Sequence, residues 1–139
     1  MSQSHAPVRS FKADALDVHV FASQPDLASY VALDVRNYLA DTIARNGSAA
    51  AILATGNSQI QFLKNLVALG GIDWSKVTLF HMDEYLGIPA DHPSCFRYYM
   101  KQRVESLVKP KAFHYIHGDC DLPHVECARY TALLESQAI

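Results

Sequence analysis

The sequence predicts an α/β fold, an open parallel sheet with helices on both of its faces. Short apolar runs alternate along the chain with longer segments in which apolar residues recur at the helical spacing. Residues 77–82 form a nearly continuous apolar run, as expected of a strand that is covered on both faces, and the run breaks directly into the adjacent carboxylates Asp83 and Glu84. Strands that alternate with helices imply right-handed crossovers and parallel pairing.

Composition places the chain among globular proteins. It has 139 residues, of which 50% are hydrophobic and 19% are charged, which fits a single domain or part of one. The 12 basic and 14 acidic residues give a net charge of −2, so no electrostatic surface for nucleic acid or for an anionic membrane is expected. The sequence has no signal-peptide pattern and no apolar run of membrane-spanning length, so we expect a cytoplasmic protein.

The first third of the chain is predicted to contain a tail, a strand and a long helix. Residues 1–10 are rich in Ser and are interpreted as a flexible tail, and the domain is expected to occupy residues 11–139. Alternation of apolar and polar residues at 16–21 predicts the first strand of the parallel sheet. Ser23 then begins a helix that ends at Asn46. Its predicted buried face consists of Leu27, Val31, Val35, Tyr38, Leu39 and Ile43.

A strand, a loop of small residues and a helix are predicted between residues 49 and 71. The apolar run 49–54 predicts the second strand. The loop after it consists of Thr55, Gly56, Asn57 and Ser58. Ser58 and Gln61 have the spacing of a capping box, which predicts that the next helix begins at Ser58. A helix N-terminus presents unpaired N–H groups and Gly56 allows close approach of the backbone, so this loop is a candidate phosphate site.

Asp83 and Glu84 lie where the third predicted strand ends. The carboxyl ends of parallel strands line the ligand crevice of an open α/β sheet, so a carboxylate at this point faces a site. Asp is also common in turns, and Asp83 could simply cap a turn before Gly87. Neighbouring residues of an extended segment point in opposite directions, so we expect Glu84 to hold the loop.

The remainder of the chain is predicted to add a helix, a strand and a second helix. The first of these helices begins at Ser94 and ends before Pro110. Residues 113–116 are predicted to form the fourth strand, and the last helix is predicted to run from Pro123 through Ala138.

Two His-x-x-Cys pairs lie around the start of the last helix. They consist of His117, Cys120, His124 and Cys127. These residue types bind zinc, and a zinc-stabilised interaction domain is therefore one alternative for the chain. Zinc sites usually combine ligands from opposed turns, whereas His124 and Cys127 begin a helix, so no metal is assigned. Cys95 lacks a catalytic His or Asn in the required order, which disfavours a cysteine nucleophile.

Two stretches together resemble a known family. The loop 55–58 at the start of a helix, followed by Phe-His-Met-Asp-Glu-Tyr-Leu-Gly-Ile-Pro-Ala-Asp-His-Pro-Ser at residues 80–94, resembles the glucosamine-6-phosphate deaminase/isomerase family, which is akin to the 6-phosphogluconolactonases. The Met-Asp-Glu-Tyr and His-Pro-Ser elements both match in order. The loop departs from the usual Thr-Gly-Gly-Thr-Pro, since Asn57 replaces the second glycine, and Ser58 and Gln59 replace Thr and Pro. A weaker likeness extends from about Phe11 to the end of the chain.

The resemblance implies a Rossmann-like fold and a reaction on an amino-sugar phosphate such as glucosamine 6-phosphate. Asp83 is implied as the base that accepts the C2 proton, which leads to aldose-to-ketose isomerisation and hydrolytic loss of ammonia; a dry crevice can raise the pKa of such a base. The implied substrate-binding residues are Thr55, Gly56, Asn57, Ser58 and Glu84. Tyr85 favours a deaminase, because lactonases usually have Arg after the Asp-Glu pair. No cofactor is implied, and the complete enzyme is expected to be a homo-oligomer.

Later elements of the family do not occur in the sequence. They are a motif of the form Gly-x-Gly-x-Asp-Gly-His followed by Ala-Phe-Asn-Glu-Pro, which resembles an acid/base site for ring opening, and a phosphate-binding Lys. The sequence also stops at Ile139 within a helical pattern. We therefore expect the N-terminal half of a longer enzyme, with a truncated sheet and no activity of its own. The alternatives are a 6-phosphogluconolactonase-like hydrolase and, if the chain is complete, a non-catalytic sugar-phosphate binding module.

Overall fold

A parallel sheet lies at the centre of the protein, whose computed structural model describes residues 6–137. The sheet has three strands in the order β3-β4-β5. They are β3 (Ala49–Leu53), β4 (Val77–His81) and β5 (Ala112–His114). Leu53 is paired with His81, and Phe80 with His114, so the carboxyl ends of the three strands lie at one edge. The predicted parallel α/β architecture is confirmed for these strands.

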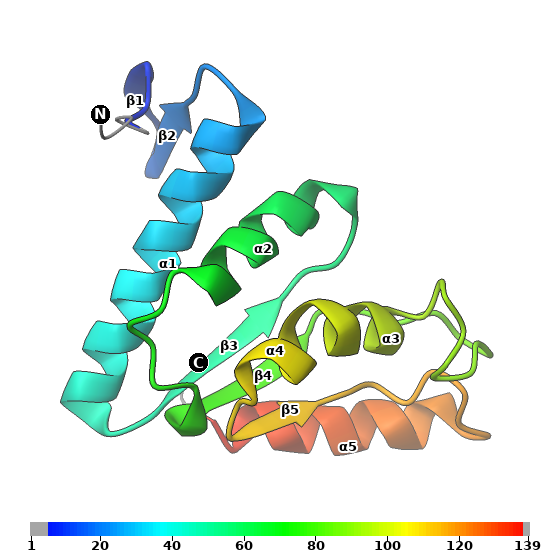
Figure 1. Cartoon of the computed structure of the whole chain (residues 1–139). Coiled ribbons are helices and arrows are strands. Elements are labelled where there is room, and N and C mark those ends of the chain that lie inside the picture. The colour runs from blue at the N-terminus through cyan, green and yellow to red at the C-terminus, as the bar shows by residue number, and fades with distance from the viewer. Residues whose placement is uncertain (1–5, 138–139) are drawn as a thin grey trace.

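Helices cover both faces of this sheet (Figure 1). On one face lie α1 (Gln24–Asn46), α2 (Ile60–Ala68), and a continuous helical stretch made of α3 (Phe96–Met100), a π-helical segment (Lys101–Glu105) and α4 (Ser106–Val108); on the other lies α5 (Pro123–Glu135). The alternation of side chains along β4 shows the two faces. Leu79 belongs to the buried cluster that includes Leu63 of α2 and Met100 of α3, whereas the ring of Phe80 lies 5.7 Å from that of Tyr130 in α5.

The core is built around β4, all five residues of which are buried. The run 77–81 is therefore mostly apolar because both of its faces are covered, as the sequence predicts. The main buried cluster consists of Leu39, Ile43, Ala49, Leu53, Leu63, Val77, Leu79, Met100 and Val104.

The N-terminal strand does not join the parallel sheet, which corrects the sequence prediction. Residues Leu16–Val20 form a strand, β2, but it pairs antiparallel with β1 (Arg9–Ala13) in a separate two-stranded sheet. This hairpin lies at the N-terminal end of α1, away from β3 (Figure 1). Asp14 makes the tight turn with φ of 52°. The predicted tail is thus part of a strand at Arg9 and Ser10, and residues 1–5 lie outside the described residues.

Most predicted helix boundaries are confirmed. The Ser23 side chain accepts a hydrogen bond from Asp26 N–H, which caps α1, and Gly47 ends this helix in the left-handed conformation. The helical stretch after the acidic loop begins at Phe96, two residues after the predicted Ser94, and ends at Val108, with Lys109 as its C-cap directly before Pro110. The last helix ends at Glu135, and Ala138, where the prediction placed its end, lies outside the described residues.

The predicted buried face of α1 is partly wrong. Leu39 and Ile43 are buried, but 66% of Tyr38 and 42% of Leu27 are exposed, and Ala28 and Ala32 are buried instead. The small residues allow close packing, and the larger apolar side chains remain on a surface that no described element covers. Within residues 6–137, no helix has both the length and the apolar character needed to cross a membrane.

Candidate functional site

Two loops leave the sheet side by side. Leu53 and His81 are the last paired residues of β3 and β4, and Met82 N–H donates a hydrogen bond to Leu53 O at 3.1 Å. Thr55 and Asp83 each lie two residues beyond this pair, so both loops begin at the carboxyl edge of adjacent parallel strands. Ligands of open α/β sheets bind at this edge.

The loop after β3 has a conformation that requires glycine. Gly56 has φ of 106° and ψ of 170°, a region essentially restricted to glycine. A Cβ at Gly56 would meet no atom within 4 Å, so backbone conformation and not crowding excludes other residues. Asn57 and Ser58 are exposed and Thr55 is half-buried, so this loop presents its backbone at the surface.

The predicted capping box is wrong. A short 3-10 turn, Asn57–Gln59, precedes α2, and its N-cap is Gly56, while Gln59 occupies the N-cap position of α2; no side-chain cap hydrogen bond forms at either. The Gln61 side chain instead donates to Asn65 Oδ1 at 2.8 Å. The extra turn moves the start of the α-helix beyond Ser58, which destroys the spacing that a capping box needs.

Asp83 is exposed at the start of the loop after β4. Its carboxylate makes no hydrogen bond or ion pair with the described part of the chain, so its oxygens are available to a ligand. The dry crevice expected around this base is not formed by residues 6–137, because these residues leave Asp83 accessible to water.

Glu84 has the opposite environment, with a fully buried side chain. Its carboxylate accepts four hydrogen bonds, from the N–H groups of Tyr85, Phe96 and Arg97 and from Cys95 Sγ. Burial alone would raise the pKa of Glu84, but these donors hold its pKa below the ordinary value. Two of them are first-turn N–H groups of α3, which have no partner within the helix. The prediction that Glu84 holds the loop is confirmed, and its contact with substrate stays a prediction.

Arg97 extends this anchorage to the loop after β5. Its guanidinium lies 3.5 Å from Glu84 and 2.9 Å from Asp119, and it donates to Ile88 O at 3.1 Å. Sequence reasoning missed Arg97, although it left one signal. Arg97 occupies the same helical face as the buried Met100 and Val104, and an arginine on a buried face is normally paired.

Glycine at position 118 completes the contact between these loops. Gly87 N–H donates to Gly118 O at 2.7 Å, and a Cβ on Gly118 would overlap the carbonyl oxygen of Tyr85. The two loops are therefore in backbone contact, which only glycine permits at this position.

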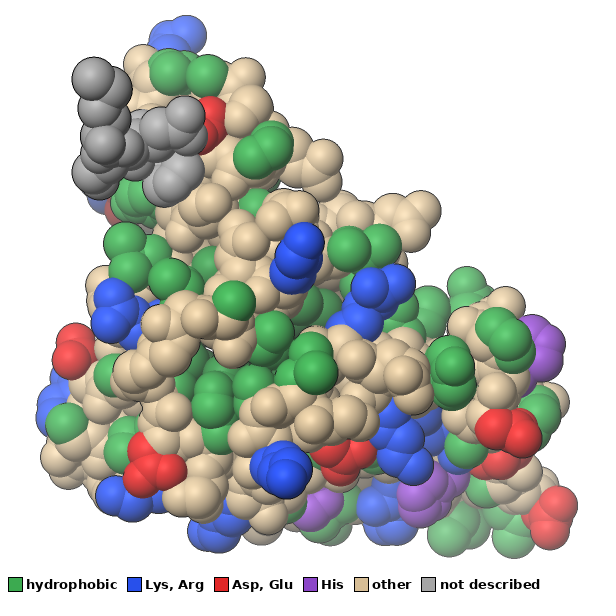
Figure 2. All heavy atoms as spheres, viewed as in Figure 1, with side chains coloured by type: hydrophobic (Ala, Val, Ile, Leu, Met, Phe, Trp, Pro, Cys, Tyr) green, Lys and Arg blue, Asp and Glu red, His purple; other side chains and the backbone are tan. Residues whose placement is uncertain are grey.

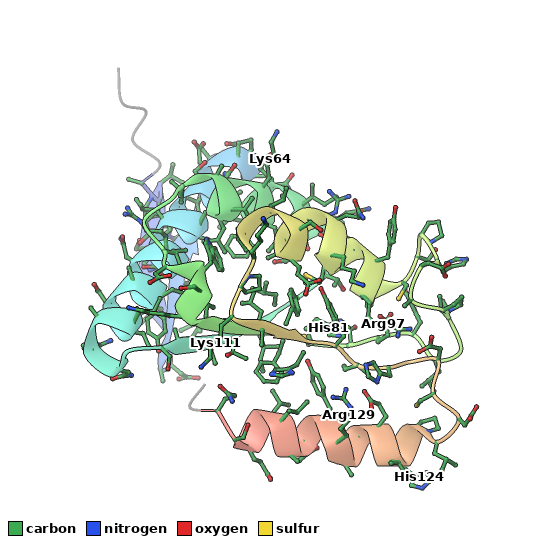
Figure 3. All side chains as sticks on the ribbon, turned by 60° about the horizontal axis from the view of Figure 1, so that its bottom comes forward. Lys64, His81, Arg97, Lys111, His124 and Arg129 are labelled. Atoms are coloured by element: carbon green, nitrogen blue, oxygen red, sulfur yellow. The ribbon has the colours of Figure 1, made fainter. Side chains whose placement is uncertain are left out.

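His81 and Tyr130 fix the end of β4. Ile116 N–H donates to His81 Nε2 at 2.8 Å, and the Tyr130 hydroxyl both accepts from His81 N–H at 3.0 Å and donates to His81 O at 2.7 Å. Burial lowers the pKa of His81 to about 4, although the negative charges of Glu84 and Asp83 act in the opposite direction. His81 is therefore neutral near pH 7, with its proton on Nδ1 because Nε2 is an acceptor. Figure 3 shows His81 and Arg97 close together beside the sheet, with Arg129 reaching from α5.

The His-x-x-Cys residues form no metal site. Within residues 6–137, no three His, Cys, Asp or Glu side chains are gathered in a metal-binding arrangement. His124 points away from the body of the protein (Figure 3), and Cys127 is exposed. Glu126 instead accepts a hydrogen bond from His117 N–H at 2.7 Å and pairs with Arg129, and these contacts, led by the Arg129 hydrogen bond, lower the pKa of Glu126 to about 2.

A groove of about 580 Å³ lies next to the two loops but does not contain them. It runs between α1 and the free edge of β3, and it reaches Ala54 and Met82 at the start of the loops. Its walls include the apolar side chains of Val35, Ile52 and Phe62. Neither Asp83 nor Gly56 lines this groove. The groove is therefore an apolar surface beside a strand edge that no other described strand covers.

The fold is that of an open α/β protein with parallel strands, and its candidate ligand site lies at the carboxyl edge of the sheet. This site combines the turn at Gly56, which leads into a helix, with the Asp83 carboxylate, which no residue of 6–137 pairs. The sequence model of the family described as glucosamine-6-phosphate isomerases/6-phosphogluconolactonase matches residues 22–139. The chain belongs to this family.

Two relatives that match by sequence are glucosamine-6-phosphate deaminases. The chain is 36% identical over 89 residues to a glucosamine-6-phosphate deaminase of Proteus mirabilis, covering 60% of this chain and 33% of the relative. It is 32% identical over 110 residues to glucosamine-6-phosphate deaminase 2 of Giardia intestinalis, covering 76% of this chain and 42% of the relative.

Solved structures agree on the fold. A monomeric glucosamine-6-phosphate deaminase has a TM-score of 0.73 at 26% identity, covering 82% of this chain and 48% of its own. A 6-phosphogluconolactonase from Shewanella baltica has a TM-score of 0.75 at 16% identity, covering 85% and 50%; this second likeness concerns the fold alone. The chain spans from 33% to 50% of the length of these relatives.

Proposed function

We propose that this chain is the N-terminal part of a glucosamine-6-phosphate deaminase/isomerase, an enzyme of cytoplasmic carbohydrate metabolism. The observation that carries the proposal is the exposed Asp83 at the end of β4, which has no partner within residues 6–137 and lies next to the loop that contains Gly56. The deaminase relatives from Proteus and Giardia support the choice of reaction. Tyr85 after the acidic pair supports it as well, by the family resemblance.

The two loops would have different roles, one in binding the phosphate and the other in presenting the base. The backbone N–H groups of residues 55–58 bind the phosphate, because unpaired amides at the start of a helix favour an anion. Asp83 takes the proton from C2 of the open-chain sugar and returns it to C1, while a proton moves from the C2 ammonium group to O1, which converts the amino-aldose to an imine at C2. Water then adds to this imine at C2 and the nitrogen leaves as ammonium, which gives the ketose. Glu84 contributes by fixing the backbone that presents Asp83.

The remaining parts of the site would come from chain beyond these residues. The groove along β3, which Tyr38 of α1 also lines, presents apolar side chains beside a strand edge, and Leu27 of α1 is exposed as well. Such surfaces fit further sheet and helices. We include in the proposal that the rest of the domain covers this surface and encloses Asp83, and that the complete enzyme is a homo-oligomer.

A 6-phosphogluconolactonase-like hydrolase is the second candidate, since the matched family includes both activities. Titration of the isotope-labelled chain, followed by the amide NMR signals of residues 55–58, separates the candidates. We expect glucosamine 6-phosphate to bind, unphosphorylated glucosamine not to bind, and 6-phosphogluconate to bind more weakly. Equal affinity for glucosamine and its phosphate would refute the phosphate loop, and preference for 6-phosphogluconate would favour the lactonase.

A further inference from the structure

One hydroxyl group joins the loop after β3 to the helix after β4. Tyr99 is half-buried in α3, and its hydroxyl donates to Gly56 O at 2.9 Å. The same oxygen accepts a hydrogen bond from Gln59 N–H at 3.1 Å. Both lone pairs of this carbonyl are therefore occupied by protein donors.

These two hydrogen bonds fix the peptide group that links Gly56 to Asn57. The peptide is trans, so its C=O and N–H bonds point in opposite directions. With the carbonyl oxygen held at Tyr99, the Asn57 N–H is directed away from α3. Gly56 has no side chain to resist rotation, and without a tether this peptide could turn its carbonyl outward.

The position of the Tyr99 ring is itself supported. The Arg103 guanidinium, from the π-helical segment, lies over the ring at 4.7 Å from its centroid, a favourable cation–π arrangement. Burial raises the pKa of Tyr99, so the hydroxyl keeps its proton and remains a donor. Arg103 and Lys64 also border a shallow hollow between α2 and α4, and Figure 2 shows hydrophobic side chains exposed in this region.

We propose that Tyr99 is a positioning residue for phosphate recognition, because its hydroxyl keeps the Gly56 carbonyl turned away from the anion and the Asn57 N–H turned toward it. This inference rests on the proposed function. A carbonyl oxygen facing a phosphate would repel it. Loss of the Tyr99 hydroxyl leaves only the Gln59 N–H to hold this carbonyl, so the peptide can turn and present an acceptor in place of a donor at the binding site. The effect is confined to ligands that carry the phosphate.

The test is the substitution Tyr99→Phe, which removes the hydroxyl and keeps the ring. Tyr98→Phe is the matched control, since Tyr98 is the neighbouring tyrosine and is 39% exposed. NMR titrations measure the dissociation constants of glucosamine 6-phosphate and inorganic phosphate. For Tyr99→Phe we expect both constants to rise about five- to tenfold, the value of one hydrogen bond. Tyr98→Phe should bind like the wild type, and melting temperatures show whether each variant is folded.

The outcomes separate this inference from the function on which it rests. Wild-type phosphate affinity in a folded Tyr99→Phe variant would overturn the inference alone. A wild-type chain that does not distinguish glucosamine 6-phosphate from glucosamine would overturn the proposed function and the inference with it. If Tyr99→Phe melts at a lower temperature, the amide signal of Asn57 at saturating phosphate decides: recovery of the wild-type position supports positioning, and persistent displacement contradicts it.

Discussion

The two loops at the carboxyl edge of the sheet are held in different ways. The loop after β4 is anchored by buried charges, with Glu84 accepting four hydrogen bonds and Arg97 linking it to Asp119. The loop after β3 is exposed at Asn57 and Ser58, and within the described residues it receives one side-chain hydrogen bond from a distant element, that of the Tyr99 hydroxyl. A proton acceptor needs precise placement, whereas several backbone amides can share a phosphate. The larger number of side-chain contacts is therefore made by the loop that carries the proposed base.

Substitution of the buried carboxylate Glu84 is expected to have the largest effect on the anchoring of the loop after β4. Glu84→Gln puts an amide nitrogen against backbone donors and leaves Arg97 less well paired. Removing one partner of a buried charged network costs about 3–5 kcal/mol, so we expect a loss of this size in the free energy of unfolding. Urea denaturation measures it, with the exposed Glu135→Gln as control. Equal stability of the two variants would contradict the anchoring role of Glu84.

Acid titration tests the other fixed point of β4. The pKa of His81 is about 4 in the folded protein against an ordinary 6.5, so between these values the unfolded chain binds a proton that the folded chain does not. The free energy of unfolding should therefore fall as pH is lowered from 6.5 to 4, by about 3 kcal/mol in total. The pKa of Glu84 is lowered and that of Glu126 is about 2, which places much of their titration below this window.

Denaturation of wild type and His81→Asn across the same pH range isolates this group. Asn cannot titrate, so the free energy of unfolding of His81→Asn should depend less on pH than that of the wild type. The difference should equal the pH-dependent loss assigned to His81. Parallel curves would show that His81 is not the group responsible.

Removal of the Tyr130 hydroxyl, which also fixes the end of β4, should reduce stability by a smaller amount. Tyr130→Phe removes a group that bonds both the N–H and the C=O of His81. Buried backbone groups left without a partner cost about 1–3 kcal/mol, and calorimetry should detect this loss. The neighbouring substitution Thr131→Val, at an exposed position, serves as control and should have little effect.

The loop after β3 should respond least in stability and most in binding. Gly56→Ala forces an unfavourable conformation on a residue that crowds nothing, at a cost of about 1–3 kcal/mol if the loop keeps its shape. Because the loop is exposed, we expect it to relax, with a stability loss near the lower value and a clear loss of phosphate affinity. Unchanged affinity would remove Gly56 from the phosphate site.

Strands and strand ends could be predicted from the sequence, because they depend on local patterns of apolar residues. The three parallel strands follow from apolar runs, and Asp83 was placed at a strand end because the run at 77–82 stops there. The antiparallel pairing of Leu16–Val20 was missed, since alternation identifies a strand and not its partner; every residue of Arg9–Ala13 is exposed, so no apolar pattern indicated that partner.

Long-range contacts were the least predictable part of the site. Three of the four donors to Glu84 lie 11 to 13 residues later, and Tyr99 reaches Gly56 across 43 residues. Such contacts depend on how the loops fold over the sheet, which no local spacing encodes. The capping box failed for a similar reason, because a 3-10 turn displaced the helix start.

Solvent exchange at C2 of the substrate tests the role of Asp83 most directly. Glucosamine 6-phosphate is incubated in D2O with the longest natural polypeptide that contains these residues, and deuterium at C2 is followed by NMR. Asp83→Asn keeps the shape of the side chain and cannot accept the proton, so exchange should slow by about 10²–10⁴-fold while substrate binding is retained. The control Asp91→Asn, another exposed acid of the same loop, should exchange at the wild-type rate. Wild-type exchange in Asp83→Asn would contradict the assignment of Asp83 as the base.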